Sequence, residues 1–143
     1  MSKSRCQYLK EYNLLIECFS PLQGHKDFLK SHVECYSSID INTPHSLLID
    51  IRDWDIETCL EYNKEYIEFF TNSTRRKRIL KIAFLTNTPN QVAQTMIFID
   101  SVQDINVDIH VFSSLEAAIS WINPHININL TNEILANFRI KAA

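Results

Sequence analysis

Residues 45–55 read HSLLIDIRDWD, an apolar run that ends abruptly in a group of charged side chains. The run predicts a β-strand, and Asp50 and Arg52 are spaced to share one face of it. We interpret these two residues first as a structural ion pair that fixes the strand end, second as a contact for a partner or ligand, and third as catalytic groups. Asp53 or Asp55 is best interpreted as the cap of the next helix. A metal site would need convergent carboxylates, and the different positions of these residues argue against it.

Strand-like and helix-like segments alternate on both sides of this stretch. The predicted strands cover residues 6–9, 14–19, 46–52, 79–85 and 107–112. The predicted helices cover residues 25–37, 55–72, 89–102 and 115–121. Capping-box patterns that begin at Thr88 and at Ser113 mark the starts of the last two helices. This order predicts an α/β domain with a mixed, mostly parallel sheet of about five strands, in which the N-terminal strand is an antiparallel edge strand.

Alternation within the strands predicts two different faces of the sheet. One face is uniformly apolar and comprises Leu14, Ile16, Cys18, Leu47, Ile49, Ile51, Ile82, Phe84, Val107, Ile109 and Val111. The other face is mixed and comprises Leu15, Glu17, Phe19, Leu48, Asp50, Arg52, Lys81, Leu85, Asp108, His110 and Phe112. If all the strand-to-helix crossovers run in one direction, the helices cover the apolar face. The mixed face is then too apolar to remain bare.

Residues 124–143 form a C-terminal extension beyond the predicted domain of residues 1–123. Alternating apolar residues predict a strand over 126–130, after which Thr131 would cap a short helix. Because this tail has an apolar side, we expect it to pack on the mixed face of the sheet, in its own subunit or across a homodimer.

The composition argues against several classes of protein. The formal charge of −3 offers no broad positive field for nucleic acid. The single glycine, Gly24, argues against the glycine-rich loops of P-loop and Rossmann proteins. The sequence shows neither a signal-peptide pattern nor a run of apolar residues long enough for a membrane span, so we expect a cytoplasmic protein. Its four scattered cysteines predict reduced thiols, and we expect neither a cofactor nor a metal.

Four segments, in their order along the chain, resemble one known family. They read YNLLIECFSP, LLIDIRDWD, KIAFLTNTPNQVAQ and IHVFSSLEAAISWI, and they lie between residues 6 and 122. The LxDxRD-type strand end and the final helix with a tryptophan are similar to those of SpoIIAA-like, STAS-related proteins. The resemblance implies a small (βα) superhelical fold related to anti-sigma-factor antagonists.

The best-known STAS mechanism is phosphorylation of a serine at a strand end, before a helix. Here the corresponding residues 50–55 contain no serine or threonine. We therefore expect no phosphorylation-dependent switch at this position.

Two functional hypotheses follow, and both use the loops at the C-terminal ends of the strands. The first is a non-enzymatic, STAS-like interaction or regulatory module that binds a protein partner. The second is a carrier or sensor of a small apolar or nucleotide ligand. The candidate contact residues are Asp50, Arg52, Asp53, Trp54, Asn87, Thr88, Ser113 and Ser114.

We expect no enzymatic activity, because the sequence lets us assign no nucleophile, base and oxyanion group together. His110 lies on the mixed face and is interpreted as an exposed or hydrogen-bonded histidine rather than a general base. Trp54 and Trp121 are interpreted first as core anchors and only second as groups that stack on a ligand.

Overall fold

The computed structural model describes residues 5–19, 25–39, 41, 43–54, 64, 67–68, 71–72, 78–102 and 107–142. The long helix predicted over 55–72 lies mostly outside these residues, and the few described positions within it are helical.

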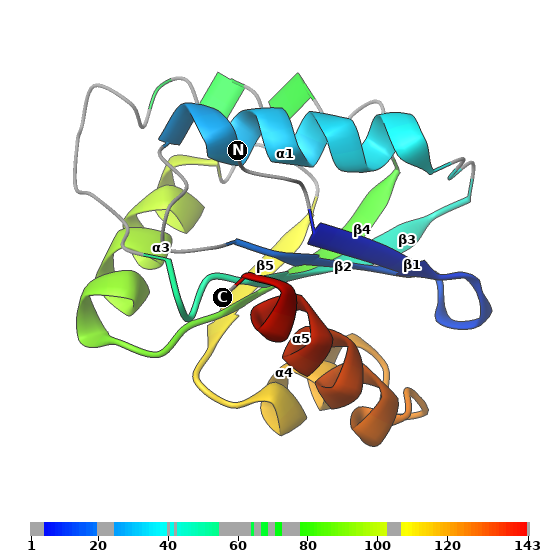
Figure 1. Cartoon of the computed structure of the whole chain (residues 1–143). Coiled ribbons are helices and arrows are strands. Elements are labelled where there is room, and N and C mark those ends of the chain that lie inside the picture. The colour runs from blue at the N-terminus through cyan, green and yellow to red at the C-terminus, as the bar shows by residue number, and fades with distance from the viewer. Residues whose placement is uncertain are drawn as a thin grey trace.

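Five strands form one sheet whose spatial order is the chain order (Figure 1). They are β1 (Arg5–Leu9), β2 (Leu14–Cys18), β3 (His45–Asp50), β4 (Ile79–Leu85) and β5 (Asp108–Phe112). β1 pairs with β2 in the antiparallel sense, and all the other pairs are parallel. The predicted mixed sheet with an antiparallel N-terminal edge strand is therefore confirmed.

The helices within residues 25–122 of the described chain begin and end close to the predicted positions, whereas the short helix near the N-terminus and the long helix of the tail were not predicted. They are the short 3-10 helix η1 (Lys10–Tyr12), α1 (His25–Ser38), α3 (Pro89–Ser101), α4 (Leu115–Ile122) and α5 (Ile128–Ala142). Thr88 and Gln91 form the predicted capping box of α3. The cap of α4 is Ser114 and not Ser113, because the Ser114 hydroxyl accepts the hydrogen bond from the Ala117 amide.

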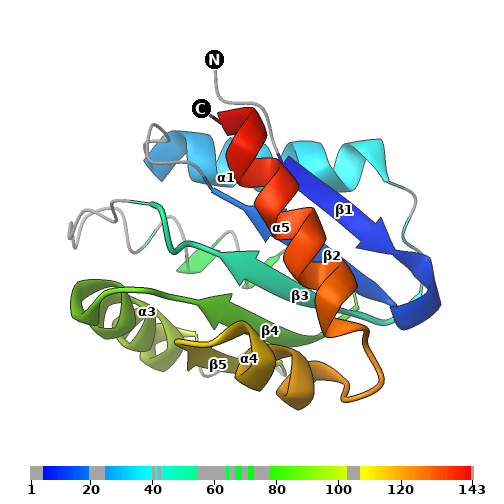
Figure 2. The same cartoon turned by 60° about the horizontal axis from the view of Figure 1, so that its bottom comes forward.

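The helices cover both faces of the sheet, and not one face as we had expected. α1 and α3 pack on one face, whereas α4 and α5 pack on the other (Figures 1 and 2). The expectation counted α4 as a crossover between strands. α4 instead follows the last strand, so the handedness rule for crossovers does not fix its side.

Each face of the sheet has its own apolar core. The core under α1 and α3 contains Leu15, Phe19, Tyr36, Leu47, Ile49, Ile51, Trp54, Ile79, Ile82, Phe84, Phe98, Val102 and Ile109. The core under α4 and α5 contains Leu9, Leu14, Ile16, Cys18, Leu48, Ala83, Leu85, Leu115, Ala118, Ile119, Ile122, Ile126, Ile134 and Leu135. Complete burial of a large aliphatic side chain contributes about 1.5 to 3 kcal/mol, so both cores contribute substantially to stability.

The face prediction was wrong for β2. Leu15 is paired with Leu47, so its side chain lies under α1, and Leu14 and Ile16 lie on the mixed face. β2 is buried on both faces and is apolar at every position except Glu17. In a strand of this kind polar and apolar residues do not alternate, so the sequence does not show which residues face which side of the sheet.

The tail is a single helix, and the strand predicted over 126–130 is wrong. The side chain of Asn127 accepts a hydrogen bond from the Leu130 amide at 3.2 Å, so the helix begins before Thr131. Thr131 is buried inside the helix, and its hydroxyl donates to the Asn127 carbonyl at 3.1 Å. Ile134 and Leu135 enter the core on the mixed face, and α5 crosses that face in Figure 2.

Candidate binding site at the carboxyl ends of the strands

Backbone hydrogen bonds continue past the last paired residues and tie the loops after β2, β3 and β4 to the neighbouring strand. The Phe19 amide donates to the Asp50 carbonyl at 3.1 Å. The amide of Ile51 donates to the Leu85 carbonyl at 3.0 Å, and the amide of Thr86 to the Phe112 carbonyl at 2.8 Å. The carboxyl ends of the parallel strands therefore share one edge, which is the usual place for binding in open α/β sheets.

Asp50 is the buried anion of this edge, and Arg52 is its partner. The Asp50 side chain is only 1% exposed, whereas that of Arg52 is 20% exposed. Asp50 Oδ1 accepts hydrogen bonds from the backbone N–H and the Nε of Arg52, each at 3.0 Å, and Oδ2 accepts one from Nη2 at 2.9 Å. The predicted ion pair is present as a two-point contact, which is the strong geometry for an arginine and a carboxylate.

The pKa of Arg52 shows that this pairing outweighs desolvation. Partial burial alone would lower the pKa of the guanidinium, but the hydrogen bonds and the charge of Asp50 raise it above its usual value. Arg52 is therefore a cation at neutral pH.

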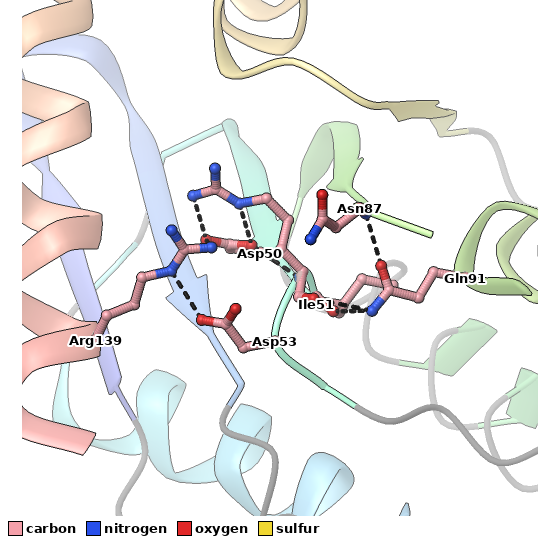
Figure 3. Close-up of polar contacts among 7 residues, drawn as sticks. Asp50, Ile51, Asp53, Asn87, Gln91 and Arg139 are labelled. Atoms are coloured by element: carbon pink, nitrogen blue, oxygen red, sulfur yellow. Dashed lines mark hydrogen bonds and ion pairs between the residues drawn. The ribbon is translucent and has the colours of Figure 1, made fainter. Parts of the chain in front are cut away.

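A second arginine, Arg139, reaches the same edge from α5 (Figure 3). Its Nε lies 2.8 Å from Oδ2 of Asp53, and its Nη2 lies 4.0 Å from Oδ2 of Asp50. The Arg139 and Asp53 side chains are 38% and 41% exposed, so the solvent weakens this pair. The carboxylates of Asp50 and Asp53 and the guanidinium groups of Arg52 and Arg139 thus balance in charge. Arg139 was not predicted as a site residue, because it lies in the tail, where no sequence motif indicated one.

Gln91, the capping-box residue of α3, also holds the loop after β3. Its side-chain nitrogen donates to the carbonyls of Ile51 at 2.8 Å, Arg52 at 3.1 Å and Trp54 at 2.9 Å. Its side-chain oxygen accepts from the amides of Asn87 at 2.7 Å and Thr88 at 3.2 Å. One buried amide therefore fixes the backbones of two neighbouring loops, as Figure 3 shows in part.

The remaining predicted contact residues divide into one core residue and four exposed residues. Trp54 is buried and packs on Phe19, with ring centroids 5.9 Å apart, so it is a core anchor. Asn87, Thr88, Ser113 and Ser114 are exposed on the loops after β4 and β5. Together with Asp53 they are the exposed polar residues that follow the carboxyl ends of β3, β4 and β5, and we call this set the strand-end ledge.

Asp50 is fully engaged within the protein. Both oxygens of Asp50 already accept hydrogen bonds from Arg52, and burial keeps a substrate away from them. In the part of the chain that the structure describes, no three His, Cys, Asp or Glu side chains come together in a way that could hold a metal ion.

His110 lies away from the ledge, on the outer strand β5. It is exposed, and its ring lies 4.8 Å from that of Trp121, which is only partly buried. The Nζ of Lys81 donates to the Trp121 carbonyl at 2.9 Å and lies 5.0 Å from the centre of the Trp121 ring. His110 is exposed, which was one of the two interpretations made from the sequence. Trp121 packs at the edge of the core under α4 and α5, as expected of a core anchor, but it remains partly accessible.

Two buried polar pairs lie under α1, and the sequence reasoning did not find them. Nδ1 of His32 lies 2.8 Å from Oε1 of Glu17, and the Tyr36 hydroxyl hydrogen-bonds to Nε2 of His45 at 2.6 Å. Burial, together with the charge of Glu17, raises the pKa of Tyr36, so its hydroxyl keeps its proton. These pairs fix the position of α1 on the sheet. In the sequence, the signal for them was Glu17, the single acidic residue within the apolar strand β2.

Cys6, Cys18 and Cys35 form no disulfide, and Cys59 lies outside the described residues. Burial and the nearby charge of Asp50 raise the pKa of the Cys18 thiol to about 12. None of the helices in the described ranges is long and apolar enough to cross a lipid bilayer.

A five-stranded mixed sheet with helices on both faces is the architecture that these observations define. No protein-family model matches the sequence, and no curated protein matches it. The fold is similar to the crystal structure of an uncharacterised protein of the DUF3478 family, with a SpoIIAA-like fold, from Shewanella loihica. The two chains share 16% identity with a TM-score of 0.52, and the match covers 85% of this chain and 98% of that chain. The SpoIIAA-like fold that the sequence resemblance implied is therefore confirmed.

Proposed function

We propose that this chain is a non-enzymatic interaction or regulatory module that binds a protein partner on the strand-end ledge. The observation that carries the proposal is the combination of exposed polar side chains with a fixed backbone. Gln91 holds the loops after β3 and β4, so the backbone around Asp53, Asn87 and Thr88 is already ordered before a partner arrives. A surface that is ordered in advance loses less conformational entropy on binding.

The charge pattern supports a partner that binds through polar contacts rather than through an apolar surface. Asp53 and Arg139 are each more than one third exposed, and the neutral side chains of Asn87 and Ser113 are exposed on the loops after β4 and β5. Their solvent-exposed pair can exchange partners at small cost, because surface ion pairs contribute only about 0 to 1 kcal/mol. The buried pair of Asp50 and Arg52 remains intact beneath them and supports the ledge.

Affinity capture with matched variants tests the proposal. The double variant Asn87→Arg and Ser113→Arg changes the ledge, whereas Asn132→Arg and Asn137→Arg adds the same two charges to exposed positions on α5. A true partner is captured by the wild type and by the α5 variant, and it is lost with the ledge variant. With that partner purified, calorimetry should give a dissociation constant at least about tenfold weaker for the ledge variant.

Two outcomes would contradict the proposal. One is a set of captured proteins that does not differ between the ledge variant and the α5 variant. The other is native mass spectrometry of the freshly purified protein that shows a retained small molecule, present in the wild type and absent from the ledge variant. That second result would identify the ledge as a ligand site of a carrier or sensor.

A further inference from the structure

Among the described residues, nothing pairs with the outer side of strand β5. β5 is the last strand of the sheet, and within the described part of the chain only β4 pairs with it. Figure 2 shows β5 at the edge of the sheet opposite β1. An open strand edge carries a row of backbone donors and acceptors that can pair with another strand.

One backbone hydrogen bond identifies which residues of β5 direct their polar groups outward. The Thr86 amide donates to the Phe112 carbonyl at 2.8 Å, so the backbone polar groups of Phe112 point toward β4. Along a strand the amide and carbonyl of one residue point to the same side, and successive residues alternate. Ile109 and Val111 therefore direct their amides and carbonyls away from the sheet, and we call these two residues the open edge.

We propose that the open edge binds the open edge of a second copy of this chain, in an antiparallel arrangement with a two-fold axis at His110. In this register Ile109 of one copy exchanges both backbone hydrogen bonds with Val111 of the other. It is the two-fold register in which both outward-facing residues are fully paired. His110 then lies directly opposite its own copy in a pair without hydrogen bonds, where side chains approach most closely.

The side chains of β5 suit this self-pairing. Asp108 would face an aromatic side chain, Phe112, and Ile109 would face Val111, so no like charges stand directly opposite each other. β5 contains neither a proline nor a lysine, which are residues that proteins commonly use to block an edge. In the proposed register, therefore, no pair of opposed residues disfavours the pairing of two β5 strands.

The helix over β5 supplies further apolar surface on the same side of the dimer. Met96 and Ile97 of α3 are 53% and 44% exposed, although both are large apolar residues. A two-fold axis perpendicular to the sheet places both copies of α3 on one side of the joined sheet. Each copy therefore contributes the exposed apolar side chains of its α3 to the same side of the joined sheet.

Charge swapping at position 110 tests the register. His110→Lys and His110→Asp each place two like charges opposite each other across the two-fold axis, so each variant alone should dimerise at least about tenfold more weakly than the wild type. Mixing the two variants should restore the dimer as a heterodimer, because the opposed charges are then opposite in sign. Sedimentation equilibrium measures the dissociation constants, and native mass spectrometry identifies the heterodimer.

A proline at the open edge gives a second test. Val111→Pro removes an outward amide and leaves the pairing with β4 unchanged, since edge strands tolerate proline where the amide faces solvent. The variant should keep the circular dichroism spectrum of the wild type and become a monomer, whereas Val111→Thr should remain a dimer. A wild type that is monomeric at every concentration, or a dimer that survives both the proline and the like-charge variants, would overturn the proposal. Neither result would bear on the strand-end ledge, whose residues follow the strands and do not lie on the open edge.

Discussion

The side-chain amide of Gln91 on α3 donates a hydrogen bond of 2.8 Å to the carbonyl of Ile51, 40 positions earlier in the chain. The same side chain also forms the capping box of its own helix. A helix start and the loop of a neighbouring strand are therefore stabilised by one buried group, and loss of that group should affect both.

We expect Gln91→Ala to lower the free energy of unfolding by about 2 to 4 kcal/mol, because several buried backbone groups lose their partners. Gln91→Glu should be at least as harmful, since a carboxylate would face three carbonyl oxygens. Gln94→Ala, on the same helix and only partly buried, should change the free energy by no more than about 0.5 kcal/mol. Urea unfolding measures all three variants, and equal effects of Gln91→Ala and Gln94→Ala would show that the bridge is unimportant.

Removal of Arg52 should destabilise the protein more than removal of both partners of the ion pair. Arg52→Ala leaves the Asp50 carboxylate buried, with Arg139 at 4.0 Å as its remaining cation. We expect a loss of about 1 to 3 kcal/mol for this single variant. The double variant Asp50→Asn and Arg52→Ala should recover part of that loss in thermal or urea unfolding. An unchanged melting curve for Arg52→Ala, with partner binding lost, would instead make Arg52 a contact residue.

The tail should be essential for the second core. Truncation after Asn123 removes Ile126, Ile134 and Leu135, so the shortened protein should bind a hydrophobic dye and aggregate or change its oligomeric state. Within the full chain, Leu135→Ala should cost about 2 to 5 kcal/mol, whereas Asn137→Ala on the exposed side of α5 should be nearly neutral. A truncated protein of unchanged solubility and stability would show that the sheet face does not need α5.

Stability should fall in alkaline solution partly because of Cys18. Burial raises its thiol pKa from 9.0 to about 12, so in this window the unfolded chain loses a proton that the folded chain keeps. The contribution is fully present below pH 9 and is lost as the pH rises toward 12, with a slope of up to about 1.4 kcal/mol per pH unit. Urea unfolding of Cys18→Ala should show a shallower pH dependence than the wild type. Cys6→Ala, which changes a less buried thiol, is the control, and identical slopes for the two variants would refute the assignment.

The sequence allowed us to predict the order of elements because the start and stop signals are local. Thr88, Pro89 and Gln91 indicate the start of α3 without reference to the rest of the molecule. The pair of Asp50 and Arg52 was also predictable, since two residues on one face of a strand lie close together wherever that strand packs.

Other features depend on contacts between distant segments, which no local pattern reports. The face of β2 was assigned incorrectly because Leu14 and Leu15 are both completely buried. Arg139 reaches Asp53 only because α5 crosses the sheet, and the alternation around Ile128 was interpreted as a strand when it belongs to a helix. The bridge from Gln91 to Ile51 likewise requires the parallel pairing of β3 with β4.

The position of α5 has a consequence for the order in which the chain folds during synthesis. Each of the five strands that the structure describes pairs with the one next to it in the sequence, so the sheet can grow as each segment leaves the ribosome. The core on the mixed face joins Leu9 and Leu14 near the N-terminus to Ile134 and Leu135 near the C-terminus. That core therefore closes only after α5 has been synthesised, and until then part of the apolar surface on this face of the sheet remains uncovered.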